Sequence, residues 1–121
     1  MRVLIVDDQV DGAKALARLL LRENAEVRIA NDGPAGLAAA REFLPEVLLL
    51  DLGLPGLDGY ELARALRAEP AFTNSLFIAL SGYAQKSDRE RTLAAGFNLH
   101  FAKPVEIASL LSAIRDCHQQ G

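Results

Sequence analysis

The hydrophobic pattern of the chain consists of short apolar runs that alternate with longer stretches in which apolar residues recur every three or four positions. The runs are four or five residues long, are rich in Val, Ile, Leu and Phe, and lie at 3–6, 27–30, 47–50, 76–80 and 99–102. Apolar runs without in–out alternation are typical of strands that are covered on both faces. The pattern therefore predicts five buried strands.

The stretches between these runs predict helices. Asp11 is interpreted as the cap of the first helix. A second helix is expected over 33–43, where it stops before Pro45. In the first helix the apolar residues fall on one face with the spacing i, i+3, i+4, i+7, which is the pattern of an amphipathic helix; they are Ala13, Leu16, Ala17 and Leu20.

The remaining three helices have start or stop signals of their own. Asp58 precedes the third helix, and Ser87 and Glu90 have the spacing of a capping box at the start of the fourth. Gly96 stands where a left-handed residue would end that helix. The last helix is expected to begin after Pro104.

Strand and helix alternate five times, and short helical connections of this kind require parallel strands with right-handed crossovers. The predicted fold is therefore an α/β domain with a doubly wound, five-stranded parallel sheet that carries helices on both faces. No linker or low-complexity segment interrupts the alternation, so we expect one domain over residues 1–121.

Composition narrows the function classes. Half of the 121 residues are apolar and the formal net charge is −3, and no cluster of Lys and Arg suggests contact with nucleic acid. No apolar run approaches the roughly 18 residues of a membrane span. Acids at Asp7 and Asp8 come too early for a signal peptide, so a cytoplasmic location is expected.

Chemically reactive residues follow four of the five predicted strands. Asp7 and Asp8 follow the first strand, Asp51 the third, Ser81 the fourth and Lys103 the fifth. In open parallel sheets, ligands bind outside the carboxyl ends of the strands, so these side chains are expected to meet at one edge. Each residue alone has an ordinary explanation as a cap, a turn residue or a surface charge.

The combination of these residues is harder to explain by structure alone. Three carboxylates held together repel one another, and a hard divalent cation with oxygen ligands resolves the conflict. A site with few protein carboxylates suits Mg²⁺, with Mn²⁺ as an alternative ion. Lys103 would supply a compact positive charge for the acids or for a phosphoryl oxygen. Gly53 was expected to let its main-chain carbonyl approach the metal closely.

On these residues the sequence resembles the response-regulator receiver family, the CheY-like phosphoacceptor domains of two-component signalling. The resemblance covers essentially the whole chain. The motifs that carry it are Val6-Asp7-Asp8, Asp51 with the following Leu54-Pro55 and Asp58-Gly59, Ser81-Gly82, and Lys103-Pro104. It implies the flavodoxin-like strand order 2-1-3-4-5. The segments 79–83 and 94–97 are similar to receivers that belong to hybrid histidine kinases.

The resemblance also implies roles for individual residues. Asp51 would be the phosphoryl acceptor, and Asp8, Asp51 and the main-chain carbonyl of Gly53 would hold Mg²⁺, with Asp7 acting through water. Lys103 would contact the phosphoryl group, and its bond to Pro104 would be cis.

Two further residues would form the switch. Ser81 is similar to the hydroxyl that turns toward the phosphoryl group. Phe101 is taken as the switch aromatic, which here lacks the hydroxyl of the usual tyrosine. Two departures from the family pattern, Gly53 and Tyr83, bear on how long the phosphoryl group survives.

The partners implied are a sensor histidine kinase or a histidine phosphotransfer protein as phosphodonor, and a downstream protein that binds the face around the fourth helix and fifth strand. No enzymatic activity is implied beyond self-phosphorylation and self-dephosphorylation. Two charge-assisted hydrogen bonds, from Ser81 and Lys103, would bias the switch by about 3–6 kcal/mol. Moving an equilibrium from 1:99 to 99:1 needs about 5.5 kcal/mol, so the bias is just adequate.

The sequence leaves three alternatives to a phosphoacceptor receiver domain. An aspartyl phosphatase of the haloacid dehalogenase type requires a second acid two residues after the nucleophile, where Gly53 stands. A nucleotide- or flavin-binding domain requires a glycine-rich turn after the first strand, where Asp7-Asp8-Gln9 stands instead. A degenerate receiver that acts only as an interaction module is disfavoured by the complete set of site residues.

Overall fold

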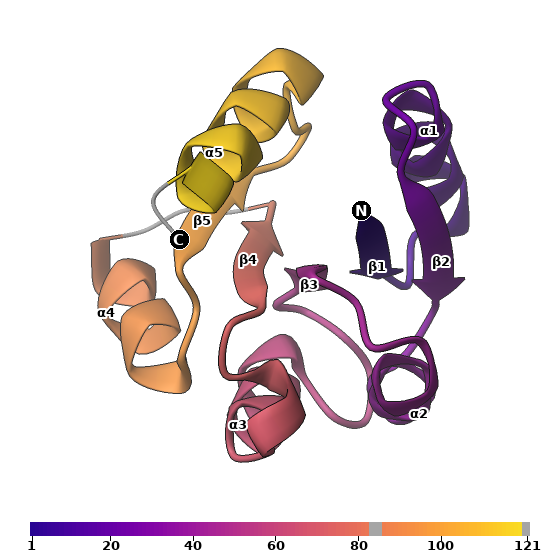
Figure 1. The fold of residues 1–121 in the computed structure, drawn as a ribbon. Helices are drawn as coiled ribbons and strands as arrows, with labels where there is room; N and C mark the ends of the chain where they lie inside the picture. Colours follow the sequence, from indigo (N-terminus) through magenta and orange to yellow (C-terminus); the bar gives the residue numbers. More distant parts are fainter. Residues whose placement is uncertain (83–85, 120–121) are drawn as a thin grey trace.

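The computed structural model describes residues 1–82 and 86–119, with the side chains of 1–82 and 90–116 (Figure 1). The strands are β1 (Arg2–Val6), β2 (Glu26–Ala30), β3 (Val47–Asp51), β4 (Leu76–Ser81) and β5 (Leu99–Ala102). The helices are α1 (Val10–Leu21), α2 (Gly33–Phe43), α3 (Gly59–Arg67), α4 (Lys86–Ala95) and α5 (Ile107–Gln119), and a short 3₁₀ helix, η1, covers Pro70–Phe72.

The strands form one parallel sheet in the order β2-β1-β3-β4-β5. This confirms the predicted fold class and strand order. The predicted strands are also correct to within one residue at each end. Two of those single residues matter, because β3 extends to include Asp51 and β4 extends to include Ser81. Both side chains are therefore fixed by the sheet itself.

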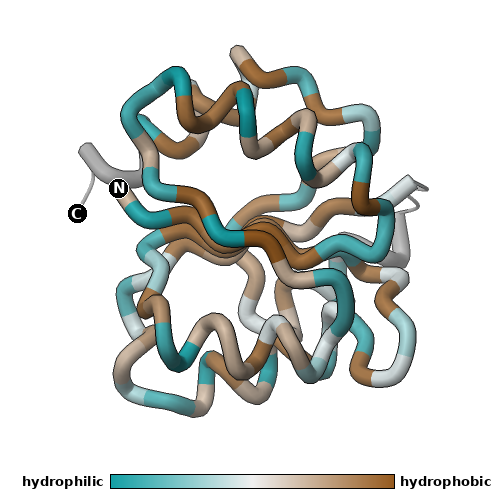
Figure 2. The backbone as a smooth tube through the Cα atoms, turned by 90° about the vertical axis from the view of Figure 1, so that its right-hand side faces the viewer, coloured by the Kyte–Doolittle hydropathy of each residue, from teal (hydrophilic) through white to brown (hydrophobic). Residues whose placement is uncertain are grey.

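Helices cover both faces of the sheet, so that the apolar strands lie in a middle layer between two helical layers (Figures 1 and 2). Alternate residues of each strand point to opposite faces. Leu4, Leu48 and Phe77 belong to the core under α2, α3 and α4, whereas Val3 and Leu49 belong to the core under α1 and α5. The continuous burial of β1, β3 and β4 explains their uniformly apolar sequence.

Two of the predicted helix starts need correction. Helix α1 begins at Val10 with Gln9 as its cap, so the interpretation of Asp11 as the cap is wrong. Asp11 lies inside the first turn, where its negative charge is favourable at the helix N-terminus. Helix α4 begins at Lys86, one residue before Ser87, whose side chain lies outside the described residues.

The ends of the helices agree better with the predictions. Gly96 has φ +101° directly after α4, as expected for a left-handed residue that terminates a helix. Among the helices in the described part of the chain, none is long and apolar enough to cross a membrane.

Arg67, at the end of α3, connects the nearby turn at Phe72 with the segment 96–98, which is distant in sequence. Its guanidinium donates to the carbonyl of Gly96 at 2.8 Å, to the carbonyl of Phe72 at 2.9 Å and to Oδ1 of Asn98 at 2.6 Å. It also lies 3.9 Å from the centre of the Phe77 ring, which adds a cation–π contact. Burial lowers the pKa of Arg67, and the hydrogen bonds offset the cost of that burial.

We therefore expect Arg67→Lys to reduce the free energy of unfolding by about 1–3 kcal/mol, because an ammonium cannot reproduce the planar fork of donors. Denaturant unfolding measures the change. Arg64→Lys, at an exposed position of the same helix, is the matched control and should lie within about 0.5 kcal/mol of wild type. Equal loss in both variants would contradict the role given to Arg67.

Candidate functional site

The sheet order brings the predicted site residues to one edge. Strands β1, β3, β4 and β5 are consecutive neighbours, and their carboxyl ends carry Asp7 and Asp8, Asp51, Ser81 and Lys103 respectively. Asp7 is fixed by the backbone as well, since its amide donates to the carbonyl of Ala30 on β2 at 3.0 Å. The site residues therefore stand at the ends of buried strands, which leave their backbone little conformational freedom.

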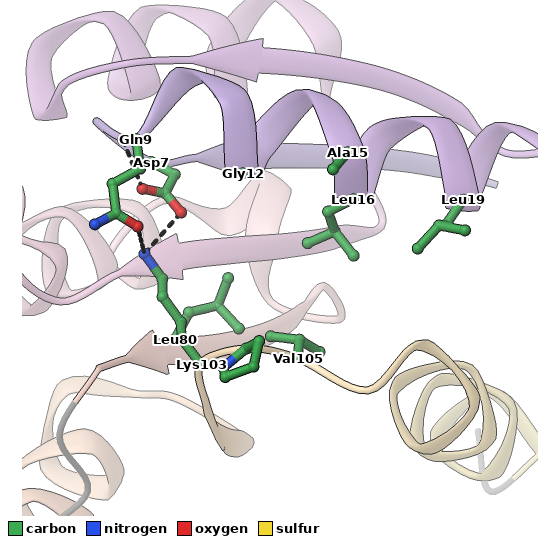
Figure 3. Close-up of a pocket in the computed structure, with 10 residues that line it drawn as sticks. Asp7, Gln9, Gly12, Ala15, Leu16, Leu19, Leu80, Lys103 and Val105 are labelled. Atoms are coloured by element: carbon green, nitrogen blue, oxygen red, sulfur yellow. Dashed lines mark hydrogen bonds and ion pairs between the residues drawn. The ribbon is translucent and has the colours of Figure 1, made fainter.

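The ammonium of Lys103 lies between two buried carboxylates. Its Nζ is 2.8 Å from Oδ2 of Asp7 and 3.2 Å from Oδ2 of Asp51. Gln9 adds a longer contact, with Oε1 at 3.5 Å from the same nitrogen, and Figure 3 shows Asp7 and Gln9 converging on Lys103. Only 19 % of the Lys103 side chain is exposed, so this cation is a component of the site and not a solvated surface charge.

Burial of the ammonium by itself lowers the pKa of Lys103, because it disfavours the charged form. The hydrogen bond to Asp7 and the negative charges of Asp51 and Asp7 act in the opposite direction and outweigh it, so the pKa of Lys103 is raised above its ordinary value. Lys103 is thus held in its charged form throughout the physiological range.

Three carboxyl groups meet at this edge. One oxygen from each of Asp7, Asp8 and Asp51 lies within 4.8 Å of the others. Asp7 and Asp51 are buried and Asp8 is exposed, so the cluster is open to solvent on the side of Asp8. Oxygen donors at this spacing, with one accessible side, fit a small hard cation that keeps part of its water shell.

The other oxygen of each buried acid is held by the backbone. Oδ1 of Asp7 accepts from the amide of Gln9 at 2.9 Å, and Oδ1 of Asp51 accepts from the amide of Gly53 at 3.0 Å. Each carboxylate is therefore oriented from two directions, by a backbone amide and by Lys103. This orientation keeps one side of each carboxylate directed toward the other acids of the cluster.

The loop after Asp51 leads into helix α3, whose first residue packs against the end of β3. The side chain of Asp58 caps the helix by accepting from the amide of Glu61 at 2.9 Å, as predicted. A Cβ at Gly59 would collide with the main-chain carbonyl of Asp51, so glycine is required for α3 to start against the end of β3. The loop thus supports the backbone that carries Asp51.

The expected role of Gly53, with its main-chain carbonyl close to a metal, stays a prediction. A Cβ there would lie 3.8 Å from Oδ1 of Asp51, which is ordinary van der Waals contact, so the structure imposes no steric need for glycine. What the structure shows is the amide of Gly53 bound to Asp51. The absence of a side chain leaves the approach to Asp51 open on that side.

Phe101 and Ser81 lie on opposite faces of the sheet, and the role of Phe101 as the switch aromatic stays a prediction. Phe101 is in register with Leu80, and both belong to the core under α1 and α5. Ser81 shares the opposite face of the sheet with His100, and its Oγ lies 2.8 Å from Nε2 of His100. The sequence reasoning missed His100, although counting alternate residues along β5 would have placed it on the face of Ser81.

Of two other expectations, the structure tests one. The peptide bond between Lys103 and Pro104 is cis, as the resemblance implied. Tyr83 lies outside the described residues.

Beside the acidic edge lies a largely apolar cleft of about 420 Å³ between α1 and the segment 103–105 (Figure 3). Leu16, Leu19 and Val105 form its walls, and Asp7 and Lys103 stand at one end. A partner that lies in this cleft would therefore reach the acids directly.

The profile of the family described as the response regulator receiver domain matches residues 3–115. The chain belongs to this family. The receiver domain is 32 % identical over 114 residues to the response regulator PleD of Caulobacter vibrioides, and the match covers 94 % of this chain and 25 % of PleD. It is 32 % identical to the DNA-binding response regulator MtrA of Mycobacterium tuberculosis, covering 94 % of this chain and 49 % of MtrA.

The receiver domain thus spans about a quarter to a half of the length of these two relatives. Among solved structures, it is similar to a CheY-like response regulator receiver domain protein from Methanospirillum hungatei, with a TM-score of 0.89 and 29 % identity. That match covers 99 % of this chain and 98 % of the other. The receiver fold therefore accounts for nearly the whole chain.

The raised pKa of Lys103 predicts how stability depends on alkaline pH. Because the folded pKa lies above the unfolded value of about 10.4, the ion pairs contribute fully below that pH. Their contribution is lost as the pH rises through the folded pKa. Denaturant unfolding across this range should show wild type losing more stability than Lys103→Met. Lys14→Met, at an exposed position of α1, should follow wild type, and parallel curves for all three proteins would contradict the assignment.

Proposed function

We propose that this receiver domain accepts a phosphoryl group on Asp51 in a magnesium-dependent reaction and passes the signal on by a change at its α4–β5 face. The observation that carries the proposal is the position of Lys103, which touches both Asp7 and Asp51 at the strand ends. A purely structural ion pair needs one carboxylate, whereas Lys103 contacts two, and Asp8 brings a third carboxylate to the same cluster. Such an excess of acid suits a site that takes up a cation and then a phosphoryl group.

In the proposed reaction, a carboxylate oxygen of Asp51 attacks the phosphorus of a phosphohistidine in the donor. The phosphorus–nitrogen bond breaks, the imidazole leaves with the electron pair, and Asp51 becomes an acyl phosphate. Water later cleaves this anhydride to restore the carboxylate and release inorganic phosphate. The bond from the Gly53 amide to Oδ1 supports the orientation of Asp51 for attack through its other oxygen.

Lys103 already lies 3.2 Å from Oδ2 of Asp51, so its ammonium needs little movement to meet a phosphoryl oxygen attached there. Asp8 and Asp51, with the main-chain carbonyl of Gly53, are proposed to hold Mg²⁺, and Asp7 to act through water. When bound, the metal would neutralise charge on the transferring phosphoryl group. Ser81 is proposed to donate its hydroxyl to the phosphorylated group.

The proposed phosphodonor is a sensor histidine kinase or a histidine phosphotransfer protein, and the proposed output is binding of a downstream protein. Membership of the receiver family supports a donor of this kind. The open side of the cluster at Asp8 and the apolar cleft beside it support access by a protein partner. No catalytic turnover of a separate substrate is proposed.

The test is to incubate the protein with Mg²⁺ and acetyl phosphate and to record its intact mass. Wild type should gain one phosphoryl group, whereas Asp51→Asn should gain none, since an amide is not a nucleophile of this kind. Asp11→Asn removes an exposed acid in the first turn of α1 and is the matched control, expected to behave as wild type. Chelation of the metal should abolish the gain.

If wild type gains no mass, a Mg²⁺ titration separates the remaining explanations. Binding that is weakened in Asp8→Asn would mean that the site is functional but needs its own kinase or loses phosphate quickly. A protein with no Mg²⁺ affinity would be a degenerate receiver, and the proposed function would be wrong.

A further inference from the structure

Gln9 is tied to the acidic edge at two points. Its main-chain amide donates to Oδ1 of Asp7 at 2.9 Å, and its side-chain Oε1 lies 3.5 Å from Nζ of Lys103. Gln9 occupies the cap position of α1, yet its side chain forms no capping hydrogen bond there. The carboxamide is therefore directed to Lys103 and not to the backbone of the helix.

The contact with Lys103 determines which way the carboxamide of Gln9 is turned. An ammonium carries three donors and no acceptor, so the oxygen of the carboxamide, and not its nitrogen, faces Lys103. The nitrogen then lies on the side away from Lys103, as Figure 3 shows. Within the part of the chain that the structure describes, no group accepts a hydrogen bond from this nitrogen. Gln9 is exposed, so two N–H donors are open to solvent next to Asp7.

Donors at this place suit an anionic group with several oxygens. A phosphoryl group attached to Asp51 would carry three oxygens that accept hydrogen bonds. The ammonium of Lys103 contacts Oδ2 of Asp51 at 3.2 Å and Oε1 of Gln9 at 3.5 Å. Because one ammonium touches both residues, the carboxamide of Gln9 stands beside the place that a phosphoryl oxygen on Asp51 would occupy.

We propose that Gln9 is a binding residue for the phosphoryl group on Asp51: its side-chain nitrogen donates a hydrogen bond to a phosphoryl oxygen while Oε1 stays on Lys103. This inference rests on the proposed phosphorylation of Asp51 and adds a donor to those of Lys103 and Ser81. Because the carboxamide is neutral, it supplies this donor without a second cation that would compete with Mg²⁺ for the acids.

The test measures the affinity of beryllofluoride, a phosphoryl analogue, by NMR titration in the presence of saturating Mg²⁺. Gln9→Met keeps the length of the side chain and removes both the donor and the acceptor. Gln9→Glu keeps an oxygen for Lys103 and removes only the donor. Val10→Glu places the same negative charge on the next residue, which is also exposed, and is the matched control. The affinity for Mg²⁺ alone is measured for each protein as a separate readout.

We expect Gln9→Met to bind beryllofluoride about 3- to 10-fold more weakly than wild type, the range expected for loss of one hydrogen bond. Gln9→Glu should bind at least as weakly as Gln9→Met, because it has lost the same donor and its charge repels the anion. Val10→Glu should remain within about threefold of wild type, since solvent and salt screen an exposed charge that makes no contact with the site. Gln9→Met should keep the wild-type affinity for Mg²⁺ to within about twofold, because no proposed metal ligand has changed.

The hydrogen bond also has a direct spectroscopic signature. The side-chain amide signals of Gln9 are the pair that disappears from the spectrum of Gln9→Met. In wild type these two signals should shift as beryllofluoride is added, with the same midpoint as the binding curve. Signals that do not move during the titration would overturn the inference.

The affinities provide three further results that would overturn it. The first is equal beryllofluoride affinity in Gln9→Met and wild type. The second is wild-type affinity in Gln9→Glu, which would mean that position 9 acts only through its oxygen on Lys103. The third is a loss in Val10→Glu as large as that in Gln9→Glu, or a parallel loss of Mg²⁺ affinity in Gln9→Met, since either would assign the effect to charge or to disturbed acids and not to the lost donor.

The behaviour of wild type separates this inference from the function on which it rests. If wild type binds Mg²⁺ but no beryllofluoride, the proposed phosphoacceptor site is wrong and the role of Gln9 falls with it. If wild type binds beryllofluoride and Gln9→Met binds it equally well, the phosphoacceptor proposal stands and only the role of Gln9 is wrong.

Discussion

Buried carboxylates at the ends of parallel strands repel one another, and this protein holds them in place with a single cation. Lys103 bridges Asp7 on the side of β1 and Asp51 on β3, with both contacts at or below 3.2 Å. The bridge joins strands that the sheet order already makes neighbours or near neighbours. The cis bond to Pro104, the α1 start and the loop into α3 all lie around this arrangement. These neighbouring segments support the contacts of Lys103 with the two acids.

The bridge lies on strands whose positions are set by apolar packing on both faces of the sheet. The fully buried cores on the two faces of the sheet fix the strands, so most of the free energy of folding comes from apolar burial, to which the ion pairs of Lys103 add. Three carboxyl groups meet at this edge, and Lys103 contacts two of them. Ser81, at the end of β4, has its Oγ 2.8 Å from Nε2 of His100 on β5.

The sequence was sufficient for the fold and for the charged part of the site because both depend on strong local patterns. Short, mostly apolar runs located the five strands, although Arg28 and His100 interrupt the second and the fifth. The residues that follow the runs located Asp7, Asp8, Asp51 and Lys103. Helix starts were less predictable, since Asp11 is a good cap residue by type and yet Gln9 holds that place. Phe101 is the switch aromatic that the resemblance implies, but strand alternation turns it toward α5 and leaves His100 beside Ser81. The 3₁₀ helix at Pro70–Phe72 had no distinctive pattern.

The most direct test of the central claim identifies the modified atom. After exposure to Mg²⁺ and a small phosphodonor, the protein is treated with borohydride, which reduces an acyl phosphate to an alcohol and leaves free carboxylates intact. Peptide mass mapping then locates the reduced residue. The account predicts homoserine at position 51 and unchanged aspartate at 7 and 8. Homoserine at position 7 or 8, or phosphate retained on Ser81, would contradict it.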